Sequence, residues 1–370
     1  MSTEISTVML DEIREQPALL RSILDRRAQL TADFVKLYCE TPIKRVFFVG
    51  NGSPYYVGCT LSGAAEKLLH ADATAIPAGY FNHHGSFLVP ECYKPEEVLL
   101  VCPAESGHSR GQVDAARRAQ ALGIRVMSTT LNPTGVLARS SDIVLPKAGV
   151  HEVAMAATKG QTMALLLIFL CFLDAAAAAG NITQEEYKRW LDACEALPAN
   201  VESSIDLTLD WFERLKDRVM GAPQYFLLGY GANYGTVQEA ALKFYECHQR
   251  PTLPMEMEES LHGPFRALHR EDMVFFLCAE DGPERQRLCK LADALHVYCD
   301  NRILVQRKDA PTMNPDSLPV ATGDVEFVNA IEYLIPMQVL SYLISYHRGI
   351  DVTIPLVDKL DGVMLPAYED

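Results

Sequence analysis

The sequence lacks any paired arrangement of cysteines. Its ten cysteines are scattered along the chain, with no Cys-x-x-Cys motif and no histidine at the spacing of a zinc finger. We therefore expect neither a disulfide framework nor a metal site. Several cysteines, such as Cys102 and Cys278, lie inside apolar runs, which is typical of buried free thiols in a reducing compartment.

The chain also lacks an excess of basic charge and a long hydrophobic run. Its formal net charge is −15, which argues against nucleic acid or anionic lipid as a partner. The longest apolar run, 163–173, is shorter than the ~20 residues that a membrane-spanning helix needs, and it predicts a helix buried on all sides. Because the N-terminal stretch is acidic and unlike a signal peptide, we expect a soluble, cytoplasmic protein.

What the chain does have is enough length and apolar content for two domains. Its 370 residues, 49% of them hydrophobic, suit two cores of roughly 150 residues each. Strand-like apolar runs alternate with helical stretches. They fall at 46–49, 73–77, 98–102, 125–128 and 143–145, and again at 225–228, 273–278 and 303–305. This rhythm predicts an α/β fold of parallel sheets with helices on both faces.

The expected organisation is two doubly wound, flavodoxin-like parallel-sheet domains in tandem. The boundaries are a helical segment at 1–40, a first domain at 41–182, a helical connector at 183–218, a second domain at 219–348 and an extended tail at 349–370. Both domains open alike, with VFFVGNGSPYY and YFLLGYGANYG. Gly50 and Gly229 in these segments are 229 − 50 = 179 residues apart, which is a spacing typical of a duplicated domain.

A Gly-x-Gly turn after the first strand is where open α/β sheets bind ligands. The dinucleotide-binding fingerprint has a third glycine three residues on, but Tyr55 and Tyr234 stand there, so no nucleotide cofactor is expected. Gly52 would let a ligand approach the backbone closely, and Ser53 could add a hydroxyl. A tight strand–helix turn without a ligand is the alternative interpretation.

The loop 103–109, Pro-Ala-Glu-Ser-Gly-His-Ser, follows the third strand-like run and opens a helix. Ser106 and Ser109 at such a helix start make a candidate phosphate site, because free N–H groups and the helix dipole favour an anion. Helix capping alone would explain one of the two serines. The equivalent loop 279–283 of the second domain has adjacent carboxylates and no hydroxyl, so only the first domain is expected to bind phosphate.

In the second domain, Glu239, Lys243 and Glu246 are spaced by four and three residues, which places them on one face of a predicted helix. His262 follows, in a turn constrained by the Gly-Pro dipeptide after it. One interpretation is an acid/base pair of Glu246 and His262. An exposed stripe of salt bridges is the other.

Five segments, in order along the chain, resemble the tandem sugar-isomerase (SIS) family. The resemblance is to the isomerase half of glucosamine-6-phosphate synthase and to the fructosamine-6-phosphate (Amadori-product) deglycases, and it covers nearly all of the chain. The segments are 50–53, 105–109, 152–159, 239–246 and 259–264. One departure is Ala104, which stands where the family's phosphate loop usually has its first serine.

The resemblance implies roles in catalysis. Glu246 stands at the position of the base that moves a proton between C1 and C2, and Lys243 would stabilise charge developing at O2 or O1. His262 would open the sugar ring and reach the active site of a neighbouring subunit, which implies a homodimer or a dimer of dimers. Lys359 is the candidate for a Schiff-base lysine in the C-terminal tail, and an ordinary tail lysine is the alternative.

The resemblance also implies a sugar-phosphate substrate, held by Gly52, Ser53, Glu105, Ser106 and Ser109, with no cofactor. Three reactions fit: deglycation of a fructosamine 6-phosphate, deamination of an aminosugar phosphate, and aldose–ketose isomerisation. Only one helix precedes the first domain, where the synthase has its glutaminase half, so we expect breakdown more than synthesis. A non-catalytic SIS protein that senses sugar phosphates is the remaining alternative.

Overall fold

The structure is a computed structural model that describes residues 5–355, 358–364 and 366–368. It divides into two compact units, each assembled from separate stretches of the chain. The first unit comprises Leu19–His151, Lys159–Asp192 and Pro355–Asp370, and the second comprises Met1–Ala18, Glu152–Thr158 and Ala193–Ile354. The sequence-based domain boundaries differ from this discontinuous division and stay predictions.

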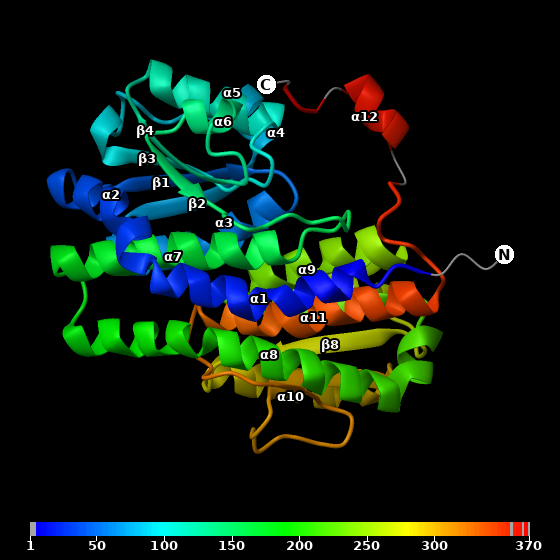
Figure 1. Cartoon of the computed structure of the whole chain (residues 1–370). Coiled ribbons are helices and arrows are strands. Elements are labelled where there is room, and N and C mark those ends of the chain that lie inside the picture. Colours follow the sequence, from blue (N-terminus) through cyan, green and yellow to red (C-terminus); the bar gives the residue numbers. More distant parts are fainter. Residues whose placement is uncertain (1–4, 356–357, 365, 369–370) are drawn as a thin grey trace. The chain divides into compact units, whose positions relative to one another are not determined.

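The first unit is built on a five-stranded, wholly parallel sheet of order β2-β1-β3-β4-β5 (Figure 1). Its strands are β1 (Arg45–Gly50), β2 (Asp72–Pro77), β3 (Val98–Cys102), β4 (Arg125–Thr130) and β5 (Ile143–Pro146). Helices α2 (Arg27–Glu40), α3 (Ser53–Leu69) and α7 (Lys159–Ala179) cover one face, and α4 (Ala78–His84), α5 (Arg110–Ala121) and α6 (Val136–Arg139) cover the other. A short 3-10 helix, η1 (Pro95–Glu97), precedes β3.

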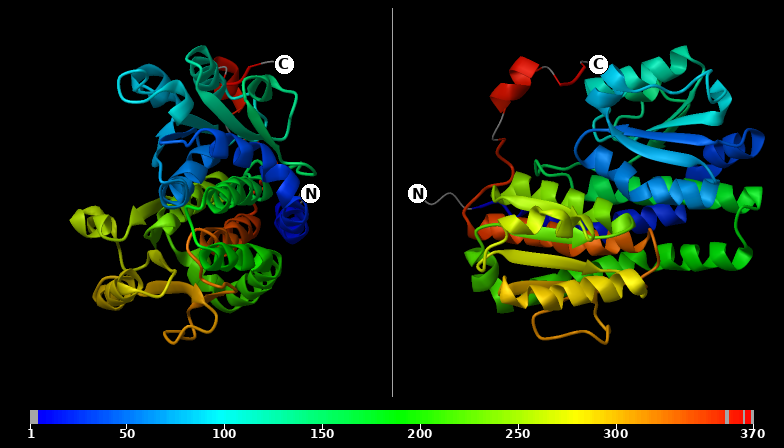
Figure 2. Two further views of the ribbon diagram at one scale, coloured as in Figure 1. Left: turned by 90° about the vertical axis from the view of Figure 1, so that its left-hand side faces the viewer. Right: turned by 180° about the vertical axis from the view of Figure 1, so that it is seen from behind.

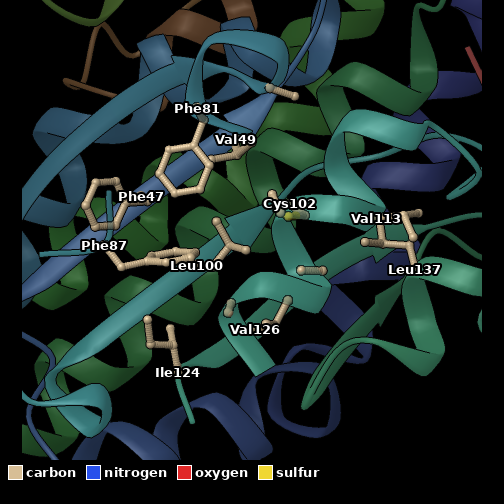
Figure 3. Close-up of a cluster of buried hydrophobic side chains, with 14 of the residues drawn as sticks. Phe47, Val49, Phe81, Phe87, Leu100, Cys102, Val113, Ile124, Val126 and Leu137 are labelled. Atoms are coloured by element: carbon tan, nitrogen blue, oxygen red, sulfur yellow. The ribbon is translucent and has the colours of Figure 1, made fainter. Parts of the chain in front are cut away.

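The central strands of this sheet are apolar on both sides because helices cover both faces. Every residue of β1 and β3 is buried. Phe47 faces the α4–α6 side, where it packs in a cluster with Phe81 and Phe87 (Figure 3). The next residue, Phe48, faces the other side and contacts Phe172 of α7, with 6.1 Å between ring centroids.

The second unit has a wholly parallel sheet of order β7-β6-β8-β9-β10. This order repeats that of the first unit, strand for strand, and Figure 2 shows strands of this sheet in yellow. Its strands are β6 (Tyr225–Gly229), β7 (Thr252–Glu256), β8 (Met273–Cys278), β9 (Asn301–Arg307) and β10 (Leu318–Val320). Helices α9 (Ala232–His248) and α11 (Asn329–His347) pack together on one face, and α10 (Pro283–Ala294) packs against the other. Short 3-10 helices lie at η2 (Glu259–His262), η3 (Pro264–Ala267) and η4 (Leu295–Val297).

Two long helices cross the division between the units. They are α1 (Val8–Asp25) and the 38-residue α8 (Gln184–Gly221). In the second unit, Trp211 of α8 packs on Phe275 of β8 with 6.2 Å between ring centroids, and its indole N–H donates to Asp316 O at 2.9 Å. The polar connector predicted at 183–218 is therefore a single amphipathic helix with a buried apolar side.

The predicted α/β fold of two parallel sheets is confirmed, and each predicted strand is present. Three details differ. The helical segment predicted at 1–40 contains two helices, α1 and α2, with a break at Arg26, and strands β7 and β10 were not predicted. The tail beyond Gly349, expected to be extended, contains the helix α12 (Asp358–Met364).

Helix α7 carries the longest apolar run. Among the described residues it is long and apolar enough to cross a membrane by length and composition, yet 78% of its most apolar window is buried inside the protein. All residues from 163 to 173 are buried, which confirms the prediction of a helix buried on all sides. Core helices of soluble proteins pass the same length test, so one such helix is weak support for a membrane span.

The ring cluster around Phe81 predicts a large stability loss on truncation. Phe81 is fully buried, with its ring centroid 5.5 Å from that of Phe47 and 4.9 Å from that of Phe87. Phe81→Ala should lower the free energy of unfolding by about 3–5 kcal/mol, measured by urea denaturation. Its neighbour Tyr80 is 61% exposed, so Tyr80→Ala should cost less than about 1 kcal/mol. Equal losses in the two variants would contradict this packing.

Candidate active site

The turn after β1 requires glycine at position 52. Gly52 precedes α3 with φ 60° and ψ −137°, a backbone region that side chains rarely adopt. The corresponding Gly231, before α9 of the second unit, has nearly the same angles, φ 53° and ψ −137°. Ser53 is the first residue of α3 and is buried. The turn thus places bare backbone and a buried hydroxyl at the carboxyl end of β1.

The predicted phosphate loop, 103–109, lies at the carboxyl end of β3 and leads into α5, with Ser109 as the residue that precedes the helix. Ser106 and Ser109 are exposed, and Ser106 Oγ accepts a hydrogen bond from the His108 amide at 3.3 Å. Gly107 has φ +76°, and a Cβ there would lie 2.7 Å from Thr130 Oγ1. The loop therefore passes close to β4 only because residue 107 has no side chain.

The C-terminal segment pairs with this loop. The Arg110 amide, at the start of α5, donates to Pro366 O at 2.9 Å, and the Tyr368 amide donates to His108 O at 2.8 Å. The Tyr368 hydroxyl donates to Asp114 Oδ1 at 2.8 Å, and the Arg110 guanidinium lies 4.6 Å from the centre of the Tyr368 ring. One amide of the helix start is thus already bonded to the chain itself. The next two amides of the first turn have no intrahelical acceptor and suit an anion.

Glu105 of the same loop has a specific cationic partner. Its carboxylate Oε1 lies 2.5 Å from Lys147 Nζ, and the Lys147 side chain is only 1% exposed. Sequence reasoning named Glu105 as a substrate-binding residue and missed Lys147. The two are far apart in the sequence and belong to no common motif, so only the fold could reveal the pair.

Helix α9 brings the three predicted residues of the second unit onto one face. Lys243 Nζ lies 2.6 Å from Glu246 Oε2 and 3.4 Å from Glu239 Oε1. The side chains of Lys243 and Glu239 are each 1% exposed, whereas that of Glu246 is 33% exposed. This group is therefore no solvent-exposed salt-bridge stripe, because only one carboxylate of the three residues can meet a ligand.

The electrostatics of the group keep Lys243 charged. Burial alone would lower the pKa of its ammonium, but the charges of Glu239 and Glu246 and the hydrogen bond to Glu246 outweigh burial and raise that pKa. One oxygen of Glu246 is therefore fixed by a permanent cation. Within the described part of the chain the other oxygen, Oε1, has no hydrogen-bond partner. A carboxylate held on one side and open on the other has the geometry of a general base.

His262 is the last residue of η2 and is exposed. Gly263 after it has φ +130°, which only glycine adopts easily. Among the described residues, no hydrogen bond or ion pair joins His262 to Glu246. Within one chain, the described residues therefore do not bring Glu246 and His262 together as the predicted acid/base pair.

Two further predicted positions have local explanations or fall outside the description. Glu152 Oε1 accepts hydrogen bonds from the Thr158 amide at 2.6 Å and from the Thr158 hydroxyl at 2.9 Å. In the segment 152–159, Glu152 therefore stabilises the chain directly before α7. Lys359 lies on α12, but its side chain is outside the described residues, and its role stays a prediction. In the described part of the chain, no three His, Cys, Asp or Glu side chains are grouped to hold a metal ion.

No family model matches the chain. Glutamine–fructose-6-phosphate aminotransferase (isomerizing) of Gloeobacter violaceus is 27% identical over 357 residues, which are 94% of this chain and 57% of that protein. The structure of a proposed phosphosugar isomerase from Clostridium difficile 630 has a TM-score of 0.85 at 24% identity and covers 98% of this chain and 99% of that one. The C-terminal domain of glucosamine-fructose-6-phosphate aminotransferase from Francisella tularensis has a TM-score of 0.82 at 19% identity, covering 95% and 98%.

These similarities confirm the resemblance to the tandem SIS family. The solved structures, at this level of identity, show the shared two-domain α/β fold alone. The sequence relative matches along almost the whole chain, and the chain spans 57% of the length of that curated relative. Activity and substrate are therefore argued from the site itself.

His248, the last residue of α9, is a buried histidine. The ring is 1% exposed and lies 4.7 Å from the ring of Phe244 and 5.1 Å from that of Tyr225. Burial, followed by the charge of Arg348, lowers the pKa of His248 to about 3. The folded protein thus resists protonation of a histidine that the unfolded chain protonates readily.

We predict that this histidine destabilises the protein in acid. A pKa lowered by folding means that stability is complete above about pH 6.5 and falls as the pH drops toward 3, by up to about 1.4 kcal/mol per pH unit. His248→Asn should flatten this slope in urea denaturation between pH 7.5 and 4.5. The exposed His269 serves as a matched control, and His269→Asn should leave the slope intact. An unchanged slope in His248→Asn would exclude His248 as its source.

Proposed function

We propose that this chain is a sugar-phosphate enzyme that moves a proton between C1 and C2 of a ketose or ketosamine 6-phosphate. The single observation that carries the proposal is the arrangement on α9. There a buried ammonium, Lys243, holds one oxygen of Glu246 at 2.6 Å while the side chain of Glu246 remains 33% exposed. A 1,2-proton shift needs one base that can take a proton from one carbon and return it to the next. A fixed, accessible carboxylate meets that need.

The proposed role of Lys243 follows from its burial. The resemblance implies that it stabilises charge at O2 or O1, but a side chain that is 1% exposed and pairs with two carboxylates is better suited to orient Glu246. We therefore propose Glu246 as the catalytic base and Lys243 as its positioning residue. His262 would act as acid/base on the ring oxygen, and Lys359 as the candidate Schiff-base lysine.

We propose that the phosphate of the substrate binds at the loop 103–109 of the first unit, with Ser53, Ser106 and Ser109 supplying hydroxyls. The support is chemical: two exposed serines, and a helix start whose second and third amides have no intrahelical acceptor, favour an anion. Binding energy from a phosphate remote from C1 and C2 would orient the reacting carbons. Ala104 leaves this loop with one hydroxyl fewer than the family pattern.

Among the possible substrates we propose a sugar 6-phosphate that carries nitrogen first. This is either a ketosamine, with deglycation as the outcome, or a 2-amino aldose such as glucosamine 6-phosphate, with deamination as the outcome. The support is the resemblance to glucosamine-6-phosphate synthase and to the fructosamine-6-phosphate deglycases, which are both named for sugar phosphates that carry nitrogen. In a fructosamine 6-phosphate the shift yields an imine at C1, which water cleaves to a sugar phosphate and a free amine. With a plain ketose phosphate the same shift yields an aldose phosphate.

One panel of substrates tests the proposal. The purified protein is incubated with Amadori 6-phosphates, glucosamine 6-phosphate and fructose 6-phosphate, and the sugar phosphate, amine and ammonia formed are measured. Amine release identifies a deglycase, ammonia a deaminase, and aldose formation alone an isomerase. Binding without turnover of any of them would contradict the proposed activity and favour a sugar-phosphate sensor.

The proton-transfer role of Glu246 has its own test. Glu246→Gln keeps the size and one hydrogen-bond acceptor but removes the base, so turnover should fall by about 10³-fold or more while the substrate still raises the melting temperature. Glu271 is exposed on the same unit, and Glu271→Gln should retain full activity. Activity within tenfold of wild type in Glu246→Gln would refute the assignment.

We also propose a homodimer, or a dimer of dimers, in which His262 acts at the site of a partner subunit. The support is the exposure of His262 and of Leu261 beside it, which is 49% exposed. A groove of about 430 Å³ adjoins them, lined by Leu261, Gly263, Phe265, Arg266, Leu268, Leu291, Leu295 and Tyr298. An exposed apolar groove of this kind is typical of an interaction surface.

We further propose a cytoplasmic location, because all ten cysteines are free thiols.

Mixed dimers test the shared site. If His262 serves the partner's site, subunits carrying Glu246→Gln and subunits carrying His262→Ala, each inactive alone, should regain activity when combined. A heterodimer of this kind holds one site with both residues intact, so up to half of the wild-type activity per dimer is expected. Verified heterodimers without any recovery would mean that both residues act within one subunit.

A further inference from the structure

A carboxylate lies in the loop that we propose to bind phosphate, directly before Ser106. The side chain of Glu105 is 31% exposed, so its charge lies close to any ligand of that loop. A carboxylate and a phosphate dianion repel each other, and the repulsion is large where water is partly excluded. Without compensation, Glu105 would work against the proposed function of its own loop.

The compensation is Lys147, which comes from the chain just beyond β5. Its Nζ is 2.5 Å from Glu105 Oε1 and also donates to Gly160 O at 3.3 Å. A Cβ at Gly160 would lie 2.2 Å from Glu105 Oε1 and 2.5 Å from Oε2. The carboxylate is therefore pressed against the first turn of α7, whose dipole also favours negative charge.

The pair is fixed through the backbone as well as through its charges. The Lys147 amide donates to Thr130 O at 3.0 Å, and the Leu131 amide donates to Glu105 O at 2.8 Å. The Thr130 hydroxyl also donates to Glu105 O at 3.3 Å. Both partners are thus anchored to the same end of β4, and Lys147, only 1% exposed, has no free path to a ligand.

We propose that Lys147 is the positioning residue of the loop 103–109. Its ammonium neutralises the charge of Glu105 and holds the Glu105 carboxylate turned away from the bound phosphate. This inference rests on the proposed phosphate site at residues 103–109. It adds a residue that acts through Glu105 and does not touch the ligand. Lys147 thereby enables a loop that contains a carboxylate to bind a dianion, in a protein with a net charge of −15.

A purely structural ion pair makes a different prediction. If the pair only stabilised the conformation of the loop, removing either partner would disturb the loop, and both substitutions would weaken anion binding. If Lys147 compensates the charge of Glu105, the two single substitutions act in opposite directions. Lys147→Met removes a positive charge beside Glu105 and should weaken anion binding, whereas Glu105→Gln removes a negative charge from the loop and should strengthen it.

The experiment measures the dissociation constants of inorganic phosphate and of fructose 6-phosphate by isothermal titration calorimetry at low ionic strength. The proteins are wild type, Lys147→Met, Glu105→Gln and the double variant. We expect binding about tenfold or more weaker in Lys147→Met, about threefold tighter in Glu105→Gln, and near wild type in the double variant. The differences should shrink at high salt, since they arise from charge.

The outcomes separate the two proposals. If the wild type binds phosphate and Glu105→Gln weakens that binding, the pair is a brace and the inference about Lys147 is wrong, while the proposed site stands. If the wild type binds neither ligand, the loop is no anion site and both proposals fail. Glu105→Gln keeps the test decisive even where Lys147→Met folds poorly, because the sign of its effect alone decides.

Discussion

Both units depend on one constraint, the parallel pairing of five strands. Parallel neighbours need a crossover between them, and the helices that make these crossovers cover both faces of each sheet. The central strands β1, β3, β6 and β8 are accordingly buried along their whole length. Parallel pairing also gathers the carboxyl ends of the strands at one edge, so that the turns at Gly52 and Gly231 and the loop 103–109 all lie at such an edge.

Within this frame, each unit buries a lysine beside a carboxylate that stays partly exposed. Lys243 does so for Glu246, and Lys147 does so for Glu105, at 2.6 Å and 2.5 Å respectively. A buried ammonium is costly unless it is paired, so each lysine fixes its partner in one orientation. We propose that this arrangement serves two purposes: in one unit it presents a base, and in the other it removes an unwanted charge.

The sequence predicted the parts of the fold that have strong local patterns. Strands such as β3 and β8 are continuous apolar runs. Strands β7 (Thr252–Glu256) and β10 (Leu318–Val320) were missed because both lie at sheet edges and have a proline in their interior. The helical spacing placed Lys243 and Glu246 together, but the burial of that lysine was not foreseeable, because it comes from packing within the unit. The pair of Glu105 and Lys147 joins distant segments and has no local signal at all.

Gly160, in the first turn of α7, lies against the Glu105 carboxylate. A side chain there would force the end of the Glu105 side chain to shift, because Glu105 Oε1 is only 2.2 Å from the position of a Cβ. A larger residue at 160 would therefore move the Glu105 carboxylate away from its position beside Lys147 Nζ. The absence of a side chain at one position of α7 thus helps to set where the negative charge of the loop 103–109 lies.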